Sequence, residues 1–257
     1  MELIDVNGVR LEVERIAAPA GGSRAPIVFL HEGLGSVAMW RDWPAQLCAA
    51  CGRGGIVYSR RGYGRSDPVP DVRGAGRLGP DYMHREAFDV LPALLARLGL
   101  QTPVLLGHSD GGTIALLHAS RHPVAACVVM APHVIVEEVS VRSIEQARDA
   151  FESGALRERL AKYHDHVDVA FWQWNDVWLS QAFRSFDIRP DCRRIAAPVL
   201  AMQGLDDPYG TLQQIRDIAP TAGPIAFEEI AACGHSPHRD QPALVTARIA
   251  DFLRTIA

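Results

Sequence analysis

The residues best suited to chemistry lie in the segment 107–111, Gly-His-Ser-Asp-Gly, which has the form G-x-S-x-G. A short apolar run at 103–106 precedes this segment and predicts a buried strand, and a helical pattern follows it at 112–122. A serine on such a sharp strand-to-helix turn projects its hydroxyl above the sheet, and the flanking glycines permit close backbone approach. The pattern therefore predicts that Ser109 is a nucleophile.

A serine hydroxyl needs a general base, and the base needs an acid that orients it. One loop that follows a strand-like run supplies Asp206 and Asp207, and a later loop supplies His235 and His238. We favour His235 as the base because it follows a glycine where the chain must bend back over the sheet, and we expect His238 to be a loop or helix-entry residue. Both aspartates are within reach, and we favour Asp207. The expected chain order is nucleophile, acid, base.

Acyl transfer also needs N–H donors that stabilise a developing oxyanion. One such donor is the backbone amide after the nucleophile, which is that of Asp110. The other is expected in the loop 31–36, His-Glu-Gly-Leu-Gly-Ser, which follows the apolar run 26–30. Its two glycines allow the backbone to turn an amide toward the nucleophile, so Gly33 is the first candidate and Leu34 the second.

The remaining pattern describes the elements that must position these residues. Two strand-like segments flank the turn signal Asn7-Gly8. Buried strands are predicted at 26–30, 55–58, 103–106, 126–130, 198–202 and 224–227. Helices are predicted at 44–51, 82–98, 112–122, 211–218 and 241–256. This alternation indicates an α/β fold with a mostly parallel sheet and helices on both faces.

One long stretch, 134–194, interrupts the alternation because it contains helical patterns rich in aromatic residues and no strand-like run. An insertion of this length cannot be a structureless loop in a compact domain. We therefore predict a helical cap at 134–194, and a core formed by 1–133 and 195–257. Three cap tryptophans are expected either to roof an apolar substrate pocket or to pack the cap itself: Trp172, Trp174 and Trp178.

Composition excludes several classes of protein. The chain has 257 residues, of which 48% are hydrophobic, and a formal net charge of -4, which argues against disorder and against nucleic acid as a partner. No apolar run is long enough to span a membrane, and the first residues do not resemble a signal peptide. The five cysteines are scattered, and Cys48 and Cys51 read as core residues and not as a metal site. We expect a cytoplasmic location.

Together these segments resemble the α/β-hydrolase superfamily over essentially the whole chain. The residues that carry the resemblance are those at 31–35, 40, 59–66, 107–112, 204–207 and 234–235. The resemblance implies an eight-stranded sheet whose second strand is antiparallel, with a helical cap after strand six. It implies the triad Ser109, Asp207 and His235, and no metal or cofactor. Epoxide hydrolases and haloalkane dehalogenases resemble this layout but have aspartate as the nucleophile.

Two acidic residues could bias the site toward cationic substrates. Glu32 departs from the family pattern, where many relatives have glycine, and a carboxylate there would oppose an oxyanion unless Arg60 or Arg61 pairs with it. The Ser-Asp-Gly-Gly elbow resembles that of valacyclovir-hydrolase-like amino acid ester hydrolases. That resemblance implies that Asp110 holds a substrate ammonium group; the alternative is that Asp110 contributes only its backbone N–H.

The sequence thus predicts a serine hydrolase that cleaves a small-molecule carboxylic ester through an acyl-enzyme. Hydrolysis of a carbon–carbon bond in a vinylogous diketone, of a thioester or of a lactone uses the same triad and stays open. A small-ligand receptor with a retained triad is the non-enzymatic alternative. A homodimer also stays open.

Overall fold

An eight-stranded sheet forms the centre of the computed structural model, which describes residues 1–19 and 24–256. The strands lie in the order β1-β2-β4-β3-β5-β6-β7-β8, and only β2 runs against its neighbours. Their bounds are β1 Glu2–Val6, β2 Val9–Ile16, β3 Ile27–Leu30, β4 Gly55–Tyr58, β5 Val104–His108, β6 Ala126–Met130, β7 Val199–Gly204 and β8 Ile225–Ile230. The predicted α/β fold and the antiparallel second strand are confirmed.

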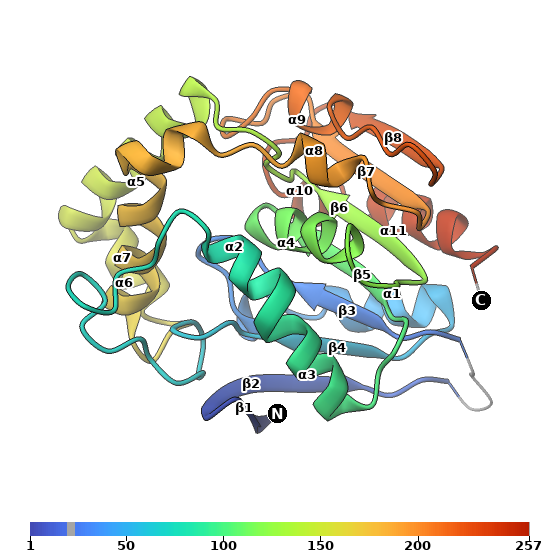
Figure 1. Cartoon of the computed structure of the whole chain (residues 1–257), viewed down its shortest axis with the longest axis horizontal. Coiled ribbons are helices and arrows are strands. Elements are labelled where there is room, and N and C mark those ends of the chain that lie inside the picture. Colours follow the sequence, from blue (N-terminus) through green and yellow to red (C-terminus); the bar gives the residue numbers. More distant parts are fainter. Residues whose placement is uncertain (20–23, 257) are drawn as a thin grey trace.

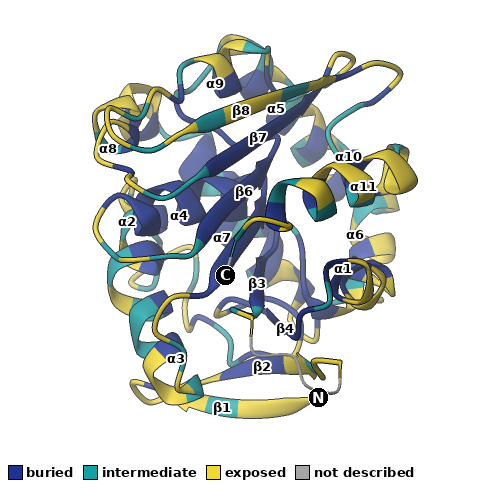
Figure 2. Cartoon of the chain, turned by 90° about the vertical axis from the view of Figure 1, so that its right-hand side faces the viewer, coloured by how far each residue is buried: buried dark blue, intermediate teal, exposed yellow. Residues whose placement is uncertain are grey.

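The two edges of the sheet differ from its centre in burial. Strands β3 to β7 are buried along their whole lengths, whereas β1 and β8 expose many residues (Figure 2). Continuous apolar runs are typical of parallel strands that are covered on both faces. The β1–β2 hairpin turns at Asn7 and Gly8, whose φ angles are 55° and 81°, as an Asn-Gly turn requires.

Helices cover both faces of the sheet (Figure 1). Helices α1 (Trp43–Cys51) and α11 (Pro242–Leu253) pack together over one face, with Cys48 and Cys51 as buried free thiols. The other face is covered by α2 (Tyr82–Arg85), α3 (Leu91–Leu98) and α4 (Asp110–Ala119). A π-helical turn at Glu86–Val90 joins α2 to α3, so the helix predicted at 82–98 is continuous but not regular. Shorter elements are η1 Val37–Trp40, η3 Gln181–Ser185, α9 Gln213–Arg216 and α10 Pro237–Asp240.

The helical insertion after β6 is confirmed. It comprises α5 (Glu138–Glu152), α6 (Ala155–Leu160), α7 (Val167–Trp178) and α8 (Arg189–Cys192). Helices α5 to α7 gather to one side of the sheet, next to the loop that follows β4 (Figure 1), whereas α8 packs against α4. An isolated antiparallel bridge between Ile135 and Asp187 joins the two ends of the insertion. The cap limits of 134–194 stay a prediction.

Within the described part of the chain, no helix combines the length and apolar character needed to cross a bilayer.

Candidate active site

Ser109 lies on the sharp turn between β5 and α4. Its φ and ψ angles are 53° and -120°, a conformation that a non-glycine residue adopts only under strain. The turn is closely packed, because a Cβ atom on Gly107 would come within 2.1 Å of the Gly111 carbonyl oxygen. A Cβ on Gly111 would come within 2.1 Å of the Leu30 carbonyl oxygen. The two glycines of the motif are therefore required by backbone contacts on both sides of the serine.

A hydrogen-bonded line joins three side chains from three different loops. Ser109 Oγ lies 2.9 Å from His235 Nε2, and His235 Nδ1 lies 2.9 Å from both carboxylate oxygens of Asp207. The Tyr209 amide and the Gln203 side chain also donate to Asp207, at 2.8 and 2.6 Å. Burial raises the pKa of Asp207, but the hydrogen bonds from His235 and the Tyr209 amide, together with the neighbouring His235 and His133 rings, outweigh it and leave the pKa below its usual value. The acid of this line is therefore held ionised.

The two alternative residues lie elsewhere. Asp206 is exposed, and its amide donates to the Cys233 carbonyl. His238 is buried, with its ring 4.8 Å from that of Trp40 and 5.2 Å from that of Trp43. The structure thus brings Asp207, and not Asp206, to the ring of His235.

The loop after β3 is held by a buried histidine. His31 Nδ1 lies 2.6 Å from the Glu32 carbonyl oxygen, and its Nε2 accepts the Arg60 amide at 3.0 Å. Burial, together with Arg60, lowers the pKa of His31 well below its usual value, so the ring is neutral and protonated at Nδ1. Over the described residues, the amides of Gly33 and Leu34 donate to no protein acceptor. Neither amide is therefore committed to an acceptor of the described chain.

Glu32 has partners that the sequence did not suggest. Its carboxylate lies 3.5 Å from Arg239 Nη2 and 3.5 Å from His108 Nδ1. Arg60 contacts only its backbone, donating to the Glu32 carbonyl oxygen at 2.9 Å. Burial raises the pKa of Glu32, but His108 and Arg239 hold it well below its usual value. The expected pairing with Arg60 or Arg61 is wrong. The arginine that faces the Glu32 carboxylate is Arg239 of α10, which lies 207 positions away in the sequence and is close to Glu32 only in the folded chain.

The side chain of Asp110 is fully buried beneath the site. It accepts a hydrogen bond from Tyr82 Oη at 2.6 Å, and Arg60 Nη1 lies 3.6 Å from the same oxygen. Trp178 Nε1 donates in turn to Tyr82 Oη at 3.0 Å. Burial raises the pKa of Asp110, and Arg60 opposes this rise. Tyr82 and Arg60 thus contact one oxygen of the carboxylate, whereas the buried Oδ1 has no hydrogen-bond partner among the described residues, and the pKa of Asp110 stays above its usual value.

The three cap tryptophans have different surroundings. The indole of Trp174 lies over Gly33, where a Cβ atom would come within 2.2 Å of Nε1. Trp178 is buried, with its ring 4.9 Å from that of His133. Trp172 packs against Phe151 and carries Arg73 over its ring at 3.8 Å. Trp174 and Trp178 are thus close to the predicted site residues, whereas Trp172 contacts Arg73.

Sequence reasoning missed two further histidines that surround His235. The rings of His108 and His133 lie 5.2 and 5.8 Å from its ring, and both are buried. Burial lowers the pKa of His133 to about 3. His108 occupies a variable position of the serine motif, and His133 follows the carboxyl end of β6. The position of His133 could have identified it as a candidate site residue from the sequence, because ligand sites in parallel sheets lie at the carboxyl ends of strands.

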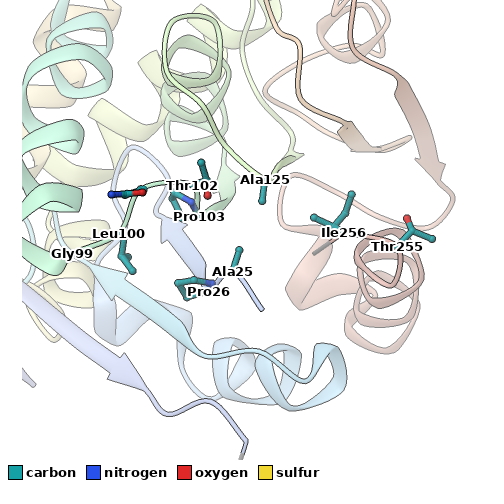
Figure 3. Close-up of a pocket in the computed structure, with 10 residues that line it drawn as sticks. Ala25, Pro26, Gly99, Leu100, Thr102, Pro103, Ala125, Thr255 and Ile256 are labelled. Carbon is teal, nitrogen blue, oxygen red and sulfur yellow. The ribbon is translucent and has the colours of Figure 1, made fainter. Parts of the chain in front are cut away.

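Ser109 is absent from the lining of two cavities of the structure. One cavity, of about 650 Å³, lies at the amino ends of the central strands, where β3, β5 and β6 begin (Figure 3). Its lining includes Ala25, Pro103 and Ile256 and carries no titratable side chain. A second cavity, of about 430 Å³, is lined by Arg60 and Tyr82, the two residues that contact Asp110. Among the described residues, no group of three or more His, Cys, Asp or Glu side chains is arranged to hold a metal ion.

Comparisons with known proteins agree with this architecture. The model of the alpha/beta hydrolase family matches residues 27–248. Serine hydrolase BPHL of Mus musculus is 30% identical over 216 residues, which cover 80% of this chain and 69% of that protein. The bifunctional esterase/perhydrolase DCH of Acinetobacter calcoaceticus is 27% identical over 225 residues, covering 73% and 76%.

Solved structures show the same fold at lower identity. The enol-lactonase of Burkholderia xenovorans LB400 superposes with a TM-score of 0.75 at 23% identity, covering 98% of this chain and 99% of that chain. A thermophilic esterase of Thermogutta terrifontis gives 0.71 at 21% identity, covering 99% and 98%. With the elbow, the sheet order and the helical insertion in place, these matches show that the chain is a hydrolase of the alpha/beta hydrolase family.

Proposed function

We propose that this hydrolase cleaves small-molecule carboxylic esters through an acyl-enzyme on Ser109. The observation that carries the proposal is the unbroken hydrogen-bonded line from Ser109 through His235 to Asp207. Such a line supplies a nucleophile, a general base and an acid that orients the base. The esterase named among the relatives supports an ester as the scissile group.

The chemistry proceeds in two displacements. His235 Nε2 takes the proton of Ser109 as Oγ attacks the ester carbonyl carbon, and Asp207 stabilises the resulting imidazolium. The imidazolium then protonates the leaving alcohol, and the carbon–oxygen bond to that alcohol breaks. In the second half, His235 takes a proton from water, which attacks the acyl-enzyme, and then returns it to Ser109. The acid product leaves and the enzyme is regenerated.

The oxyanion in each tetrahedral intermediate needs two aligned donors. We assign these to the amide of Asp110, at the start of α4, and to the amide of Gly33, with Leu34 beside it. The helix start also favours negative charge at this point. Because Glu32 is paired with Arg239 and faces His108, its carboxylate adds little opposing charge.

We assign Trp174 and Trp178 to the walls beside the reacting group, and Asp110 and Glu32 to holding the site together. Under this assignment, an α-amino group on the substrate brings no advantage. Comparing an α-amino ester with its deaminated analogue tests that point, and a preference that disappears in Asp110→Asn would restore the ammonium-binding role.

The decisive experiment combines turnover with trapping. An activated aryl ester is offered to the wild-type protein, to Ser109→Ala and to the exposed control Ser153→Ala. We expect multiple turnovers in the wild type and the control, and none in Ser109→Ala. Mass spectrometry after reaction with an organophosphate probe should place the adduct on Ser109. Full turnover by Ser109→Ala, or a single turnover by the wild type as for a receptor, would refute the proposal.

A further inference from the structure

One histidine of the helical insertion contacts two loops that follow strands of the sheet. His164 lies in the loop between α6 and α7 and is buried. Its Nδ1 atom accepts a hydrogen bond from the Gly64 amide at 2.9 Å, and its Nε2 atom lies 3.0 Å from the Leu34 carbonyl oxygen. Figure 1 shows the segment after β4 passing close to α6 and α7. His164 therefore joins the insertion to the loops after β3 and β4.

The two contacts determine which ring nitrogen of His164 carries a proton. Because the Gly64 amide donates to Nδ1, that nitrogen is unprotonated. Burial lowers the pKa of His164, so the ring is neutral and its single proton is on Nε2. Nε2 therefore donates to the Leu34 carbonyl oxygen. Both nitrogens of this buried ring have a partner, as buried polar groups usually do.

The loop that carries Gly64 is anchored to strand β2. Glu12, which is buried on β2, accepts hydrogen bonds from Ser59 Oγ at 2.8 Å and from the Arg65 amide at 3.1 Å. The Gly64 carbonyl oxygen accepts the Asp165 amide at 3.0 Å. Both backbone groups of Gly64 thus bond to the insertion, and the sheet holds the loop to which the insertion is attached.

The Leu34 carbonyl belongs to a tight turn in the loop 31–36. The Gly35 amide closes this turn by donating to the Glu32 carbonyl oxygen at 3.1 Å, which is the hydrogen bond of a β-turn. Gly33 and Leu34 are the two central residues, and their amides are the donors that we assign to the oxyanion. The direction in which these two amides point therefore depends on what holds the two ends of the turn.

Two histidines hold those ends. At the start of the turn, His31 Nδ1 donates to the Glu32 carbonyl oxygen at 2.6 Å. At its end, His164 Nε2 donates to the Leu34 carbonyl oxygen, which accepts no other hydrogen bond over the described chain. The Tyr63 ring packs against both, with its centroid 4.9 Å from that of His31 and 6.0 Å from that of His164. The end of the turn is therefore held by the insertion.

We propose that His164 is a positioning residue of this hydrolase: its hydrogen bond to the Leu34 carbonyl oxygen holds the turn that presents the Gly33 and Leu34 amides to the oxyanion. The inference rests on the proposed function, which assigns the oxyanion to these amides. Such donors are effective because they are aligned before the charge develops. The helical insertion thus affects the rate of acyl transfer through the backbone of this turn.

Three substitutions separate the two hydrogen bonds of His164. His164→Gln places an amide N–H donor near the position of Nε2 and can keep the bond to Leu34. His164→Asn can still accept from Gly64 but is too short to reach Leu34, and His164→Phe keeps a ring and loses both bonds. On an activated aryl ester, we expect kcat to fall about fivefold in His164→Asn and His164→Phe with little change in KM, as the loss of one net hydrogen bond predicts. His164→Gln should recover most of the loss.

The matched control is His166→Asn, which changes an exposed histidine two positions further along the same segment and should keep the wild-type kcat. A merely structural role for His164 predicts that kcat follows the melting temperature of each variant and not the donor to Leu34. Thermal unfolding of the four variants supplies this comparison. Equal kcat values in His164→Gln and His164→Asn would overturn the proposal, and this pair decides even if His164→Phe does not fold.

Hydrogen exchange followed by NMR tests the geometry without any reaction. The Gly35 amide reports on the closure of the turn, and the Gly64 amide reports on the contact with Nδ1. In His164→Asn we expect the Gly35 amide to exchange about fivefold faster, as the loss of one net hydrogen bond predicts. The Gly64 amide should keep its protection there, and both amides should exchange as in the wild type in His164→Gln.

This measurement separates the inference from the proposed function. Wild-type protection of the Gly35 amide in His164→Asn would contradict the positioning role even if Ser109 proves essential. If Ser109→Ala still hydrolyses esters, the proposed function fails, while a Gly35 amide whose protection depends on the donor at position 164 would uphold the contact that holds the turn.

Discussion

His108 places its Nε2 atom 2.6 Å from the backbone carbonyl oxygen of His235. A carbonyl oxygen only accepts hydrogen bonds, so Nε2 carries the proton and holds the loop that bears His235, the proposed general base. On the other side of the ring, Nδ1 lies 3.5 Å from Glu32, which in turn faces Arg239. His108 is therefore a positioning residue, since it contacts His235 and reaches Ser109 only through it.

Replacing His108 tests this positioning role. The variant His108→Phe keeps a buried ring but removes the donor, and we expect kcat to fall about fivefold with little change in KM, as the loss of one net hydrogen bond predicts. His108→Gln retains an N–H donor and should recover part of the loss. Steady-state kinetics on an activated ester measures both constants. If His108→Phe has the wild-type kcat, the contact has no catalytic consequence.

Asp207→Asn should separate orientation from packing. Tyr209 and Gln203 donate to different carboxylate oxygens of Asp207, so the asparagine oxygen can keep only one of these hydrogen bonds. The amide group also offers an N–H to a ring nitrogen that needs an acceptor. The wrong tautomer of His235 is then favoured, and we expect kcat to fall by about 10⁴-fold, as in other Ser-His-Asp enzymes. Single-turnover kinetics on an aryl ester checks this, with thermal unfolding as the folding control. A decrease of less than about tenfold would remove Asp207 from the triad.

The contact between Gly33 and Trp174 predicts a clash that a second substitution relieves. The φ angle of Gly33 is outside the left-handed region, so alanine is allowed by the backbone, but its Cβ would come within 2.2 Å of the indole. We expect Gly33→Ala to displace the oxyanion loop and lower kcat about a hundredfold, comparable to the loss of one oxyanion donor.

The double variant Gly33→Ala/Trp174→Leu provides the matched test. Removing the indole makes room for the methyl group, so kcat should recover relative to Gly33→Ala alone. Trp174→Leu by itself shows the cost of losing the ring. Strictly additive effects of the two substitutions would mean that the clash is not the cause.

Buried neutral histidines should make the fold sensitive to acid. Burial lowers the pKa of His118 to about 4 and that of His133 to about 3, from 6.5 in the unfolded chain. Between these values the unfolded chain binds more protons, so stability falls as the pH drops below 6.5. Each such histidine contributes up to about 1.4 kcal/mol per pH unit.

Urea unfolding at pH 7 and pH 5 measures this dependence. The free energy of unfolding should be lower at pH 5, and the difference should shrink in His118→Gln by about 2 kcal/mol. The glutamine keeps a donor for the Ala87 carbonyl oxygen, which His118 Nδ1 contacts at 2.9 Å. A wild-type stability that does not change between the two pH values would show that these rings titrate normally.

Much of the fold could be predicted because its signals are local. Asn7-Gly8 marks a hairpin, and the short apolar runs mark buried strands. Glycines flank Ser109 because neighbouring backbones come so close there that a Cβ atom would clash with them. The irregular elements could not be predicted from the sequence in the same way. The π-helical turn at Glu86–Val90 interrupts a regular periodicity, and α9 is shorter than the pattern at 211–218 indicates.

The sequence by itself determined which residues sit at the carboxyl ends of the strands, and hence that Ser109, Asp207 and His235 share one edge of the sheet. Parallel strands connected by helices leave no other arrangement. Only the tertiary structure decided which groups neutralise one another. Glu32 contacts Arg239 across 207 positions of the chain, and Asp110 contacts Arg60 and Tyr82. Such contacts depend on how separate elements pack, which no local pattern encodes.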